Sequence, residues 1–158
     1  MRKYYRRDNL IYRWFRPLDR VTRAIGLKYK EGQIAHLDLV QEATSPTWTR
    51  LDRKKRVALR SRGLLFLRSQ LEIFPIETVI CDGRTVSDEL DDLIGGVKMD
   101  EGKLSRITWH VGIGTLSSRT IYMAGWNIPL NRPTGLGSAG EEKLGRILAS
   151  RLSVFRKI

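Results

Sequence analysis

Cysteine and histidine are scarce in this chain, and their scarcity limits how the fold is held together. The single cysteine, Cys81, leaves no partner for a disulfide within the 158 residues. One cysteine and two histidines also provide too few ligands for a typical structural zinc site. We therefore expect a fold stabilised by its apolar core, without metal or other cofactor.

Long apolar runs are missing as well. No stretch approaches the roughly 20 residues that a membrane-spanning helix needs, and the basic N-terminus lacks the apolar centre of a signal peptide. The hydrophobic content of 41% and the charged content of 29% are typical of a folded globular protein. We expect one α/β domain over residues 1–158 in the cytoplasm, with no membrane partner. The basic residues 1–30 are expected to form a helical segment packed on this domain or flanking it.

Acidic residues are outnumbered, because 29 Lys and Arg against 17 Asp and Glu give a formal net charge of +12. The basic excess forms two blocks, with ten basic and two acidic residues in 1–30, and eight basic and one acidic in 50–68. Residues 77–101 reverse the sign, with eight acidic and two basic residues. Blocks of cations rich in arginine are typical of phosphate-binding surfaces. We expect a nucleic-acid partner, DNA rather than RNA; a solvated surface, an acidic protein or an anionic membrane are the alternatives.

Apolar periodicity predicts alternating strands and helices. Helices are expected over 8–28, 52–73 and 85–94 and from residue 138, with strands at 33–40 and 77–82 and a hairpin within 104–124. Pro17 should kink or split the first helix, and Gly112 and Gly114 should form the hairpin turn. Strands that alternate with helices indicate a three-layer α/β/α fold with a small, mostly parallel central sheet.

Three loops follow the expected strands and should converge on one edge of the sheet, because ligands of open α/β sheets bind at such strand ends. The first follows Asp38, the second carries Asp82, and the third spans residues 125–137. Asp38 is either a paired structural carboxylate or a site residue, because a buried unpaired carboxylate is costly. Asp82 is either a base or a hydrogen-bond acceptor for a nucleobase, or a structural residue that caps the following helix or forms a salt bridge with Arg84.

The third loop combines amides, a cation, prolines and glycines immediately before a helix. Gly137 and Ser138 would present backbone N–H groups to a phosphate at that helix N-terminus. An ordinary turn is the alternative, with Ser138 and Glu141 forming a capping box.

Residues 33–150 resemble uracil-DNA glycosylase-like proteins in the order of elements and the placement of loops. His36 to Trp48 looks like the second core strand and its loop, Phe66 to Leu71 like the next helix, and Thr78 to Val86 like the third strand. Asn127 to Asn131 occupies the place of that family's minor-groove loop. The family's first catalytic motif is not found, and Asn127 stands where the family has histidine.

The resemblance implies a DNA-repair protein that recognises a base flipped out of the duplex, with base excision by a glycosylase as its enzymatic form. The alternative is a non-catalytic binding module or protein–protein accessory module of the same fold. By position, Asp82 and Asn127 would be catalytic, and Leu130 would be the wedge that fills the vacated stack. The base pocket would include Asp38, Gln41 and Trp48. The residues expected to contact nucleic acid are Arg50, Arg53, Lys54, Lys55, Arg56, Arg84, Leu130, Asn131, Arg132, Gly137 and Ser138.

Overall fold

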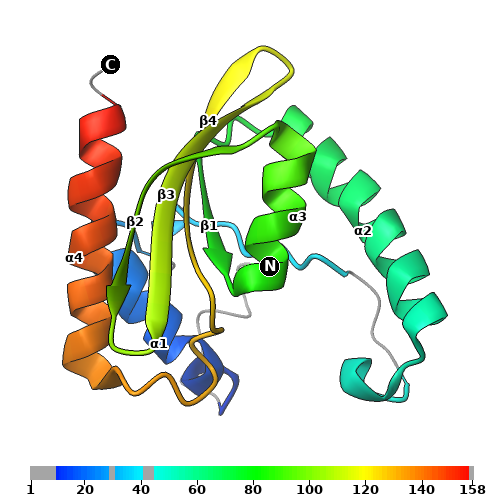
Figure 1. Ribbon diagram of the computed structural model, residues 1–158, viewed down its shortest axis with the longest axis horizontal. Coiled ribbons are helices and arrows are strands. Elements are labelled where there is room, and N and C mark those ends of the chain that lie inside the picture. Colours follow the sequence, from blue (N-terminus) through cyan, green and yellow to red (C-terminus); the bar gives the residue numbers. More distant parts are fainter. Residues whose placement is uncertain (1–9, 29–30, 41–44, 157–158) are drawn as a thin grey trace.

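The computed structural model of the chain describes residues 10–28, 31–40 and 45–156, and it is an α/β structure, as expected. Four α-helices, a short 3-10 helix and one four-stranded sheet make up this part of the chain (Figure 1). In chain order they are α1 (Leu10–Ala24), η2 (Trp48–Arg50), α2 (Arg53–Ile73), β1 (Thr78–Asp82), α3 (Arg84–Ile94), β2 (Val97–Leu104), β3 (Ile107–Leu116), β4 (Arg119–Trp126) and α4 (Gly137–Phe155).

The sheet has the strand order β1-β4-β3-β2, and its mostly parallel character was predicted wrongly. Only β1 and β4 run parallel, whereas β4 pairs antiparallel with β3 and β3 with β2. The consecutive strands β2, β3 and β4 form a meander because short turns join them. The β3–β4 turn lies at Ser117 and Ser118, with φ values of 47° and 68°, and not at Gly112 and Gly114. Gly112 lies inside β3, where a Cβ atom would stand 2.5 Å from the Val97 carbonyl oxygen.

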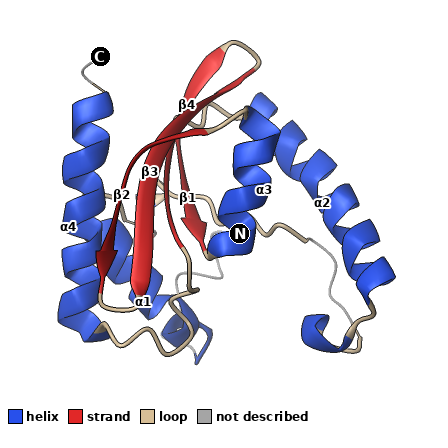
Figure 2. Cartoon of the chain, in the orientation of Figure 1, coloured by secondary structure: helices blue, strands red, loops and turns tan. Residues whose placement is uncertain are grey.

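The segment 33–40 was predicted as a strand, and the structure shows it as a loop outside the sheet (Figure 2). Its apolar residues Leu37 and Leu39 pack against a core cluster, which explains the apolar pattern without strand pairing. The backbone at Leu39 crosses α2 at Gly63, where any side chain would overlap the Leu39 carbonyl oxygen. The edge strand β2 was not predicted, since most of its residues are exposed and give no apolar alternation.

Helices lie on both sides of the sheet because successive residues of β4 point to opposite faces. Ala124 and Trp126 join the core cluster that contains buried residues of α1 and α4. Ile121 and Met123 join the cluster that contains buried residues of α2 and α3. α1 and α4 therefore cover one face, and α3 with part of α2 covers the other (Figure 1).

Two arginine side chains hold the helices that flank the sheet in place. The buried Glu141 of α4 accepts a hydrogen bond from Arg20 of α1 at 2.5 Å, so the expected capping box with Ser138 does not form. On the other side, Arg119 of the β3–β4 turn donates to the carbonyl oxygens of Leu71, Glu72 and Phe74 at the end of α2. α2 has no basic residue in its own last turn, so Arg119 supplies the cation that a helix C-terminus favours.

Candidate functional site

Two of the three predicted loops meet where the parallel strands β1 and β4 end. The backbone N–H of Gly83 donates to the Trp126 carbonyl oxygen, and that of Arg84 donates to the Asn127 carbonyl oxygen, both at 3.1 Å. These bonds join the start of α3 to the loop that follows β4. The expectation that the segments around Asp82 and Asn127 share one edge of the sheet is therefore confirmed for these two loops.

Asp82 holds the loop after β4 in place. Its Oδ1 atom accepts hydrogen bonds from the Trp126 indole N–H at 2.7 Å and from the Leu130 backbone N–H at 2.9 Å. Burial raises the pKa of the Asp82 carboxyl group, and these two hydrogen bonds oppose that rise. The carboxylate thus connects β1 to the loop, which is a positioning role.

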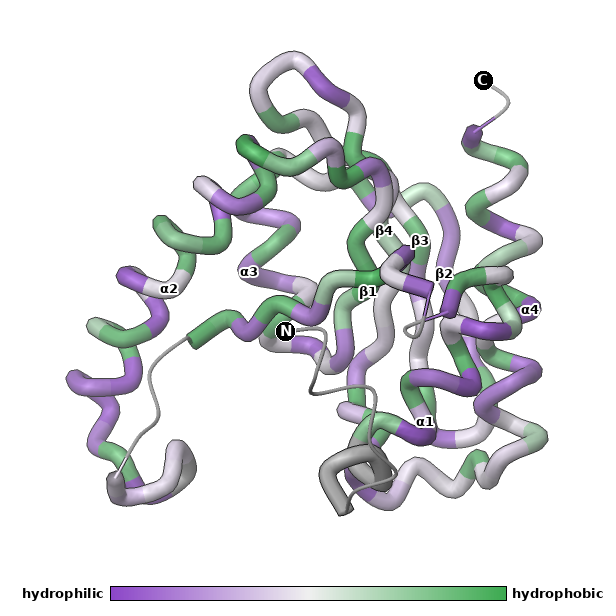
Figure 3. Tube along the Cα trace, turned by 180° about the vertical axis from the view of Figure 1, so that it is seen from behind, coloured by the Kyte–Doolittle hydropathy of each residue, from purple (hydrophilic) through white to green (hydrophobic). Residues whose placement is uncertain are grey.

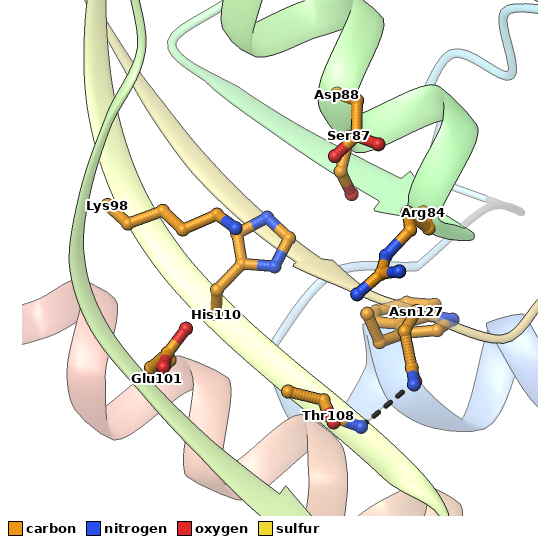
Figure 4. A pocket seen from close by; sticks show the side chains of 9 residues that line it. Arg84, Ser87, Asp88, Lys98, Glu101, Thr108, His110 and Asn127 are labelled. Atoms are coloured by element: carbon orange, nitrogen blue, oxygen red, sulfur yellow. Dashed lines mark hydrogen bonds between the residues drawn. The ribbon is translucent and has the colours of Figure 1, made fainter.

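Asn127 continues the pairing of β3 and β4 beyond the end of β4. Its backbone N–H donates to the Thr108 carbonyl oxygen at 3.0 Å, and its side-chain oxygen accepts from the Thr108 N–H at 2.9 Å (Figure 4). Both residues expected to be catalytic are therefore engaged in bonds that shape the loop. The amide nitrogen of Asn127 is the part of this side chain that remains to face a ligand.

A polar hollow opens beside this loop, between the start of α3 and the strands β2 and β3. It is an open depression with about 340 Å³ of space between and above the side chains, open solvent included. Its lining combines buried or half-buried polar groups with exposed charges: Arg84, Ser87, Asp88, Lys98, Glu101, Thr108, His110, Trp126 and Asn127.

His110 is one of the lining residues, and it was not among the residues predicted for the site. It is 8% exposed, and its Nε2 atom has no hydrogen-bond partner. Burial lowers the pKa of His110, and the charge of Lys98 lowers it further, while Asp88 and Glu101 act in the opposite direction. A Cβ atom on Gly125 would stand 2.7 Å from Ser87 Oγ and 2.9 Å from His110 Nε2, so glycine keeps the space beside the imidazole open.

The predicted base pocket is not assembled by the described residues. Asp38 is exposed and lies 3.5 Å from His36 Nε2, and the hydrogen bond with His36 lowers the pKa of its carboxyl group. Trp48 is half-buried in η2, and neither residue lines the hollow. Gln41 lies outside the described residues. The predicted pocket does not form among the described residues because segment 33–40 does not enter the sheet.

The loop before α4 agrees with the prediction only in part. Leu130 is 4% exposed and belongs to the core shared with α4, so in this structure its side chain is not presented at the surface as a wedge would be. Asn131 and Arg132 are exposed on the loop surface, as a contact with phosphates requires. Gly137 and Ser138 are exposed at the start of α4, where no side chain caps the helix.

The second basic block forms the start of α2, at the end of this helix farther from the sheet (Figures 1 and 3). Lys55 lies 3.6 Å from the N-cap residue Asp52. No salt bridge among the described residues includes the other four cations predicted here, which are Arg50, Arg53, Lys54 and Arg56. In both views the start of α2 lies on the side of the molecule where β1 and β4 end.

Three residues that line the hollow were not predicted from the sequence: His110, Ser87 and Lys98. His110 lies within the predicted hairpin 104–124 and was not among the predicted site residues, and Lys98 lies on a strand that was not predicted. The available signal was the glycine at 125, which pairs with His110 in the β3–β4 register. That pairing becomes visible only once the hairpin turn is placed at Ser117 and Ser118.

Compared with family models, with curated proteins and with solved structures, the chain matches none of them. Among the residues that the structure describes, no three His, Cys, Asp or Glu side chains are grouped so that they could hold a metal ion. Within 10–28, 31–40 and 45–156, no helix has both the length and the apolar character needed to span a lipid bilayer. The function therefore has to be argued from the side chains themselves.

Proposed function

We propose that the protein binds nucleic acid, with the start of α2 as its main phosphate-binding surface. The observation that carries this proposal is the group of exposed or half-exposed cations Arg50, Arg53, Lys54 and Arg56, which have no salt bridge among the described residues. Phosphates of a nucleic-acid strand are the polyanion that such a group of arginines and lysines fits best.

The position of these cations strengthens the argument. The first turn of a helix carries a partial positive charge, so cations there destabilise the helix by a few tenths of a kcal/mol to about 1 kcal/mol each. α2 has no acidic residue in its first turn and relies on the N-cap Asp52 alone for compensation. A local cost of this kind is typical of residues kept for binding.

The loops at the ends of β1 and β4 offer further contacts on the same side of the molecule. Arg84, Asn131 and Arg132 are exposed there. A strand of nucleic acid that contacts the start of α2 could extend toward these loops. Duplex DNA is the first partner to test, because the two contact regions are separate in the fold.

Salt dependence tests this proposal. Anisotropy of labelled duplex DNA, single-stranded DNA and RNA would be measured at increasing salt concentration, with the double variant Arg53→Gln/Lys54→Gln beside the wild type. Each lost phosphate contact should make the slope of log K against log salt shallower by about 1. The matched control is Lys143→Gln/Arg146→Gln, which removes the same charge from the exposed surface of α4 on the opposite side of the sheet. Equal changes in both variants, or no binding by the wild type, would contradict the proposal.

Excision of a flipped base is a second candidate, and one observation favours it: the loops of Asp82 and Asn127 meet at one edge of the sheet. A base that activates water needs a carboxylate oxygen directed at the substrate. Oδ1 of Asp82 already accepts two hydrogen bonds from the protein, which leaves Oδ2 as the oxygen that could act on a substrate. The raised pKa of this half-buried carboxyl group would make it a stronger base than an exposed aspartate. Incubation of a uracil-containing duplex with the protein, followed by cleavage at abasic sites, tests this candidate. Abasic sites that disappear in Asn127→Ala, while DNA binding persists, would favour excision over binding alone.

A further inference from the structure

The Nε2 atom of His110 is a buried polar atom that nothing in the described structure satisfies. Buried polar atoms are almost always hydrogen-bonded, and an exception calls for a ligand, a water molecule or an ion as its partner. His110 is one of the residues that line the polar hollow. Its unsatisfied atom therefore points to a partner within that hollow.

Two cations converge on this imidazole. Arg84 extends toward it from the start of α3, and Lys98 extends toward it from β2 on the opposite side (Figure 4). Neither side chain forms a salt bridge with another described residue. The backbone of Arg84 is fixed by its hydrogen bond to Asn127, so its guanidinium group starts from a defined position. Two cations beside a histidine form a site for an anion.

The charge of that anion is limited by two carboxylates. Asp88 and Glu101 also line the hollow, and both are exposed at its rim. Their charges offset those of Arg84 and Lys98, so the lining has little net positive charge to compensate the greater desolvation cost of a doubly charged ligand. A singly charged group satisfies both sets of residues better than a doubly charged one. A phosphodiester carries one negative charge, whereas a terminal phosphate carries nearly two at neutral pH.

We propose that the hollow binds one phosphodiester group of a nucleic-acid strand, which Arg84, Lys98 and His110 contact together. The inference rests on the proposed function and names a second contact point, distinct from the start of α2. Arginine suits this role because its planar group donates two parallel hydrogen bonds to phosphate oxygens. The bound phosphate favours the protonated imidazole, so Nε2 gains an acceptor when the strand binds.

The histidine itself provides the first test. The imidazole resonances of His36 and His110 would be followed by NMR as a function of pH, with and without a 5′-hydroxyl oligonucleotide. His36→Gln assigns the two signals. Burial and the charge of Lys98 oppose protonation of His110 in the unbound protein, whereas Asp88 and Glu101 favour it. The pKa of His110 should rise on binding, so affinity should increase as pH falls. An unchanged pKa overturns the subsite, as does a shift with inorganic phosphate that the oligonucleotide does not reproduce.

Matched variants provide the second test. Arg84→Gln and Lys98→Gln should each weaken oligonucleotide binding by about tenfold, whereas Arg146→Gln and Lys143→Gln on α4 should bind like wild type. All four positions are exposed, so an unchanged unfolding midpoint is the check on folding. If Arg84→Gln and Lys98→Gln match their controls while Arg53→Gln/Lys54→Gln still weakens binding, the subsite is wrong and the proposed function stands. If the wild type binds no nucleic acid, the proposed function itself fails.

A third test distinguishes an internal phosphodiester from a terminal 5′-phosphate as the group that binds in the hollow. The 5′-hydroxyl strand and the same strand with a 5′-phosphate should bind equally well, because the hollow is proposed to take an internal phosphodiester. Tight binding that requires the 5′-phosphate would overturn the proposal in favour of a site for strand ends.

Discussion

α4 and α2 are long helices of 19 and 21 residues, and they serve the molecule differently. α4 buries Leu144, Leu148 and Leu152 against α1 and the sheet. α2 buries Leu67 and Leu71 in its second half. Its exposed apolar residues are Val57, Leu65, Phe66 and Ile73, with exposed fractions between 50% and 76%.

The charges of the two helices differ in the same way. The buried carboxylate Glu141 of α4 is paired with Arg20 of α1. The cations Arg53, Lys54 and Arg56 at the start of α2 have no salt bridge among the described residues. α4 is therefore a helix that stabilises the fold, whereas much of the outer surface of α2 contributes neither buried apolar residues nor, for these three cations, an ion pair within the described residues. The predictions below test this distinction.

The largest contrast is expected from one truncation in each helix. Leu148 is completely buried and Leu65 is 70% exposed. Leu148→Ala should lower the free energy of unfolding by about 2 to 5 kcal/mol, because it leaves a cavity between α4 and the sheet. Leu65→Ala should change it by less than about 0.5 kcal/mol. Urea denaturation of both variants measures the difference, and similar losses would show that α2 packs as α4 does.

The next largest loss of stability is expected from Asp82, a half-buried carboxylate at the end of β1. Asp82→Ala removes the acceptor for the Trp126 indole N–H and the Leu130 backbone N–H. Two donors then lose their partner, and the free energy of unfolding should fall by about 2 to 4 kcal/mol. Thermal unfolding of this variant gives the value. A stability equal to wild type would mean that Asp82 does not hold the loop and is available for another role.

The pH dependence of Asp82→Asn sharpens this prediction. Asparagine keeps the acceptor oxygen but does not ionise. Because burial raises the pKa of Asp82 in the folded state, the folded protein favours the protonated carboxyl group. The contribution of this pKa shift to the free energy of unfolding is present at low pH and is lost as pH rises through the raised pKa. Wild type should therefore lose stability relative to Asp82→Asn as the pH increases through this pKa. Unfolding curves of both proteins at several pH values measure the difference. A constant difference would contradict the raised pKa.

The smallest expected effect has the opposite sign. Arg53→Gln/Lys54→Gln removes two cations from the first turn of α2, where the helix dipole disfavours them. The double variant should be more stable than wild type by up to about 1 kcal/mol while it binds nucleic acid more weakly. Differential scanning calorimetry beside the anisotropy titration measures both quantities. A loss of stability would mean that these cations support the fold.

The helices with a clear apolar stripe were predicted well from the sequence. The ranges 52–73 and 85–94 nearly coincide with α2 and α3, and the start expected at Ser138 lies one residue from that of α4. Their boundaries are set locally, by the N-cap Asp52 and by Gly95 in the left-handed conformation. The sequence also identified the edge of the sheet at which Asp82 and Asn127 meet.

The rest depends on contacts between distant residues. β2 is polar because it lies at the sheet edge. The apolar residues of segment 33–40 pack against both core clusters, Leu37 and Leu39 on the side of α2 and α3 and Ile34 on the side of α1 and α4. The sequence alone does not show that a polar segment is an edge strand or that an apolar segment is a packed loop. The hollow was missed for the same reason, since His110, Lys98 and Ser87 come together only through the register of β2 with β3 and the packing of α3.

The attachment of Arg119 to the end of α2 has a dynamic consequence. The guanidinium group and Ser117 secure the carboxyl end of the helix, Arg60 pairs with Glu89 further along, and the first turns project beyond both contacts. Helix ends without tertiary contacts open most often, so amide protons should exchange with solvent progressively faster from Leu71 back to Arg56. A strand of nucleic acid seated on those first turns would slow that exchange where it is fastest.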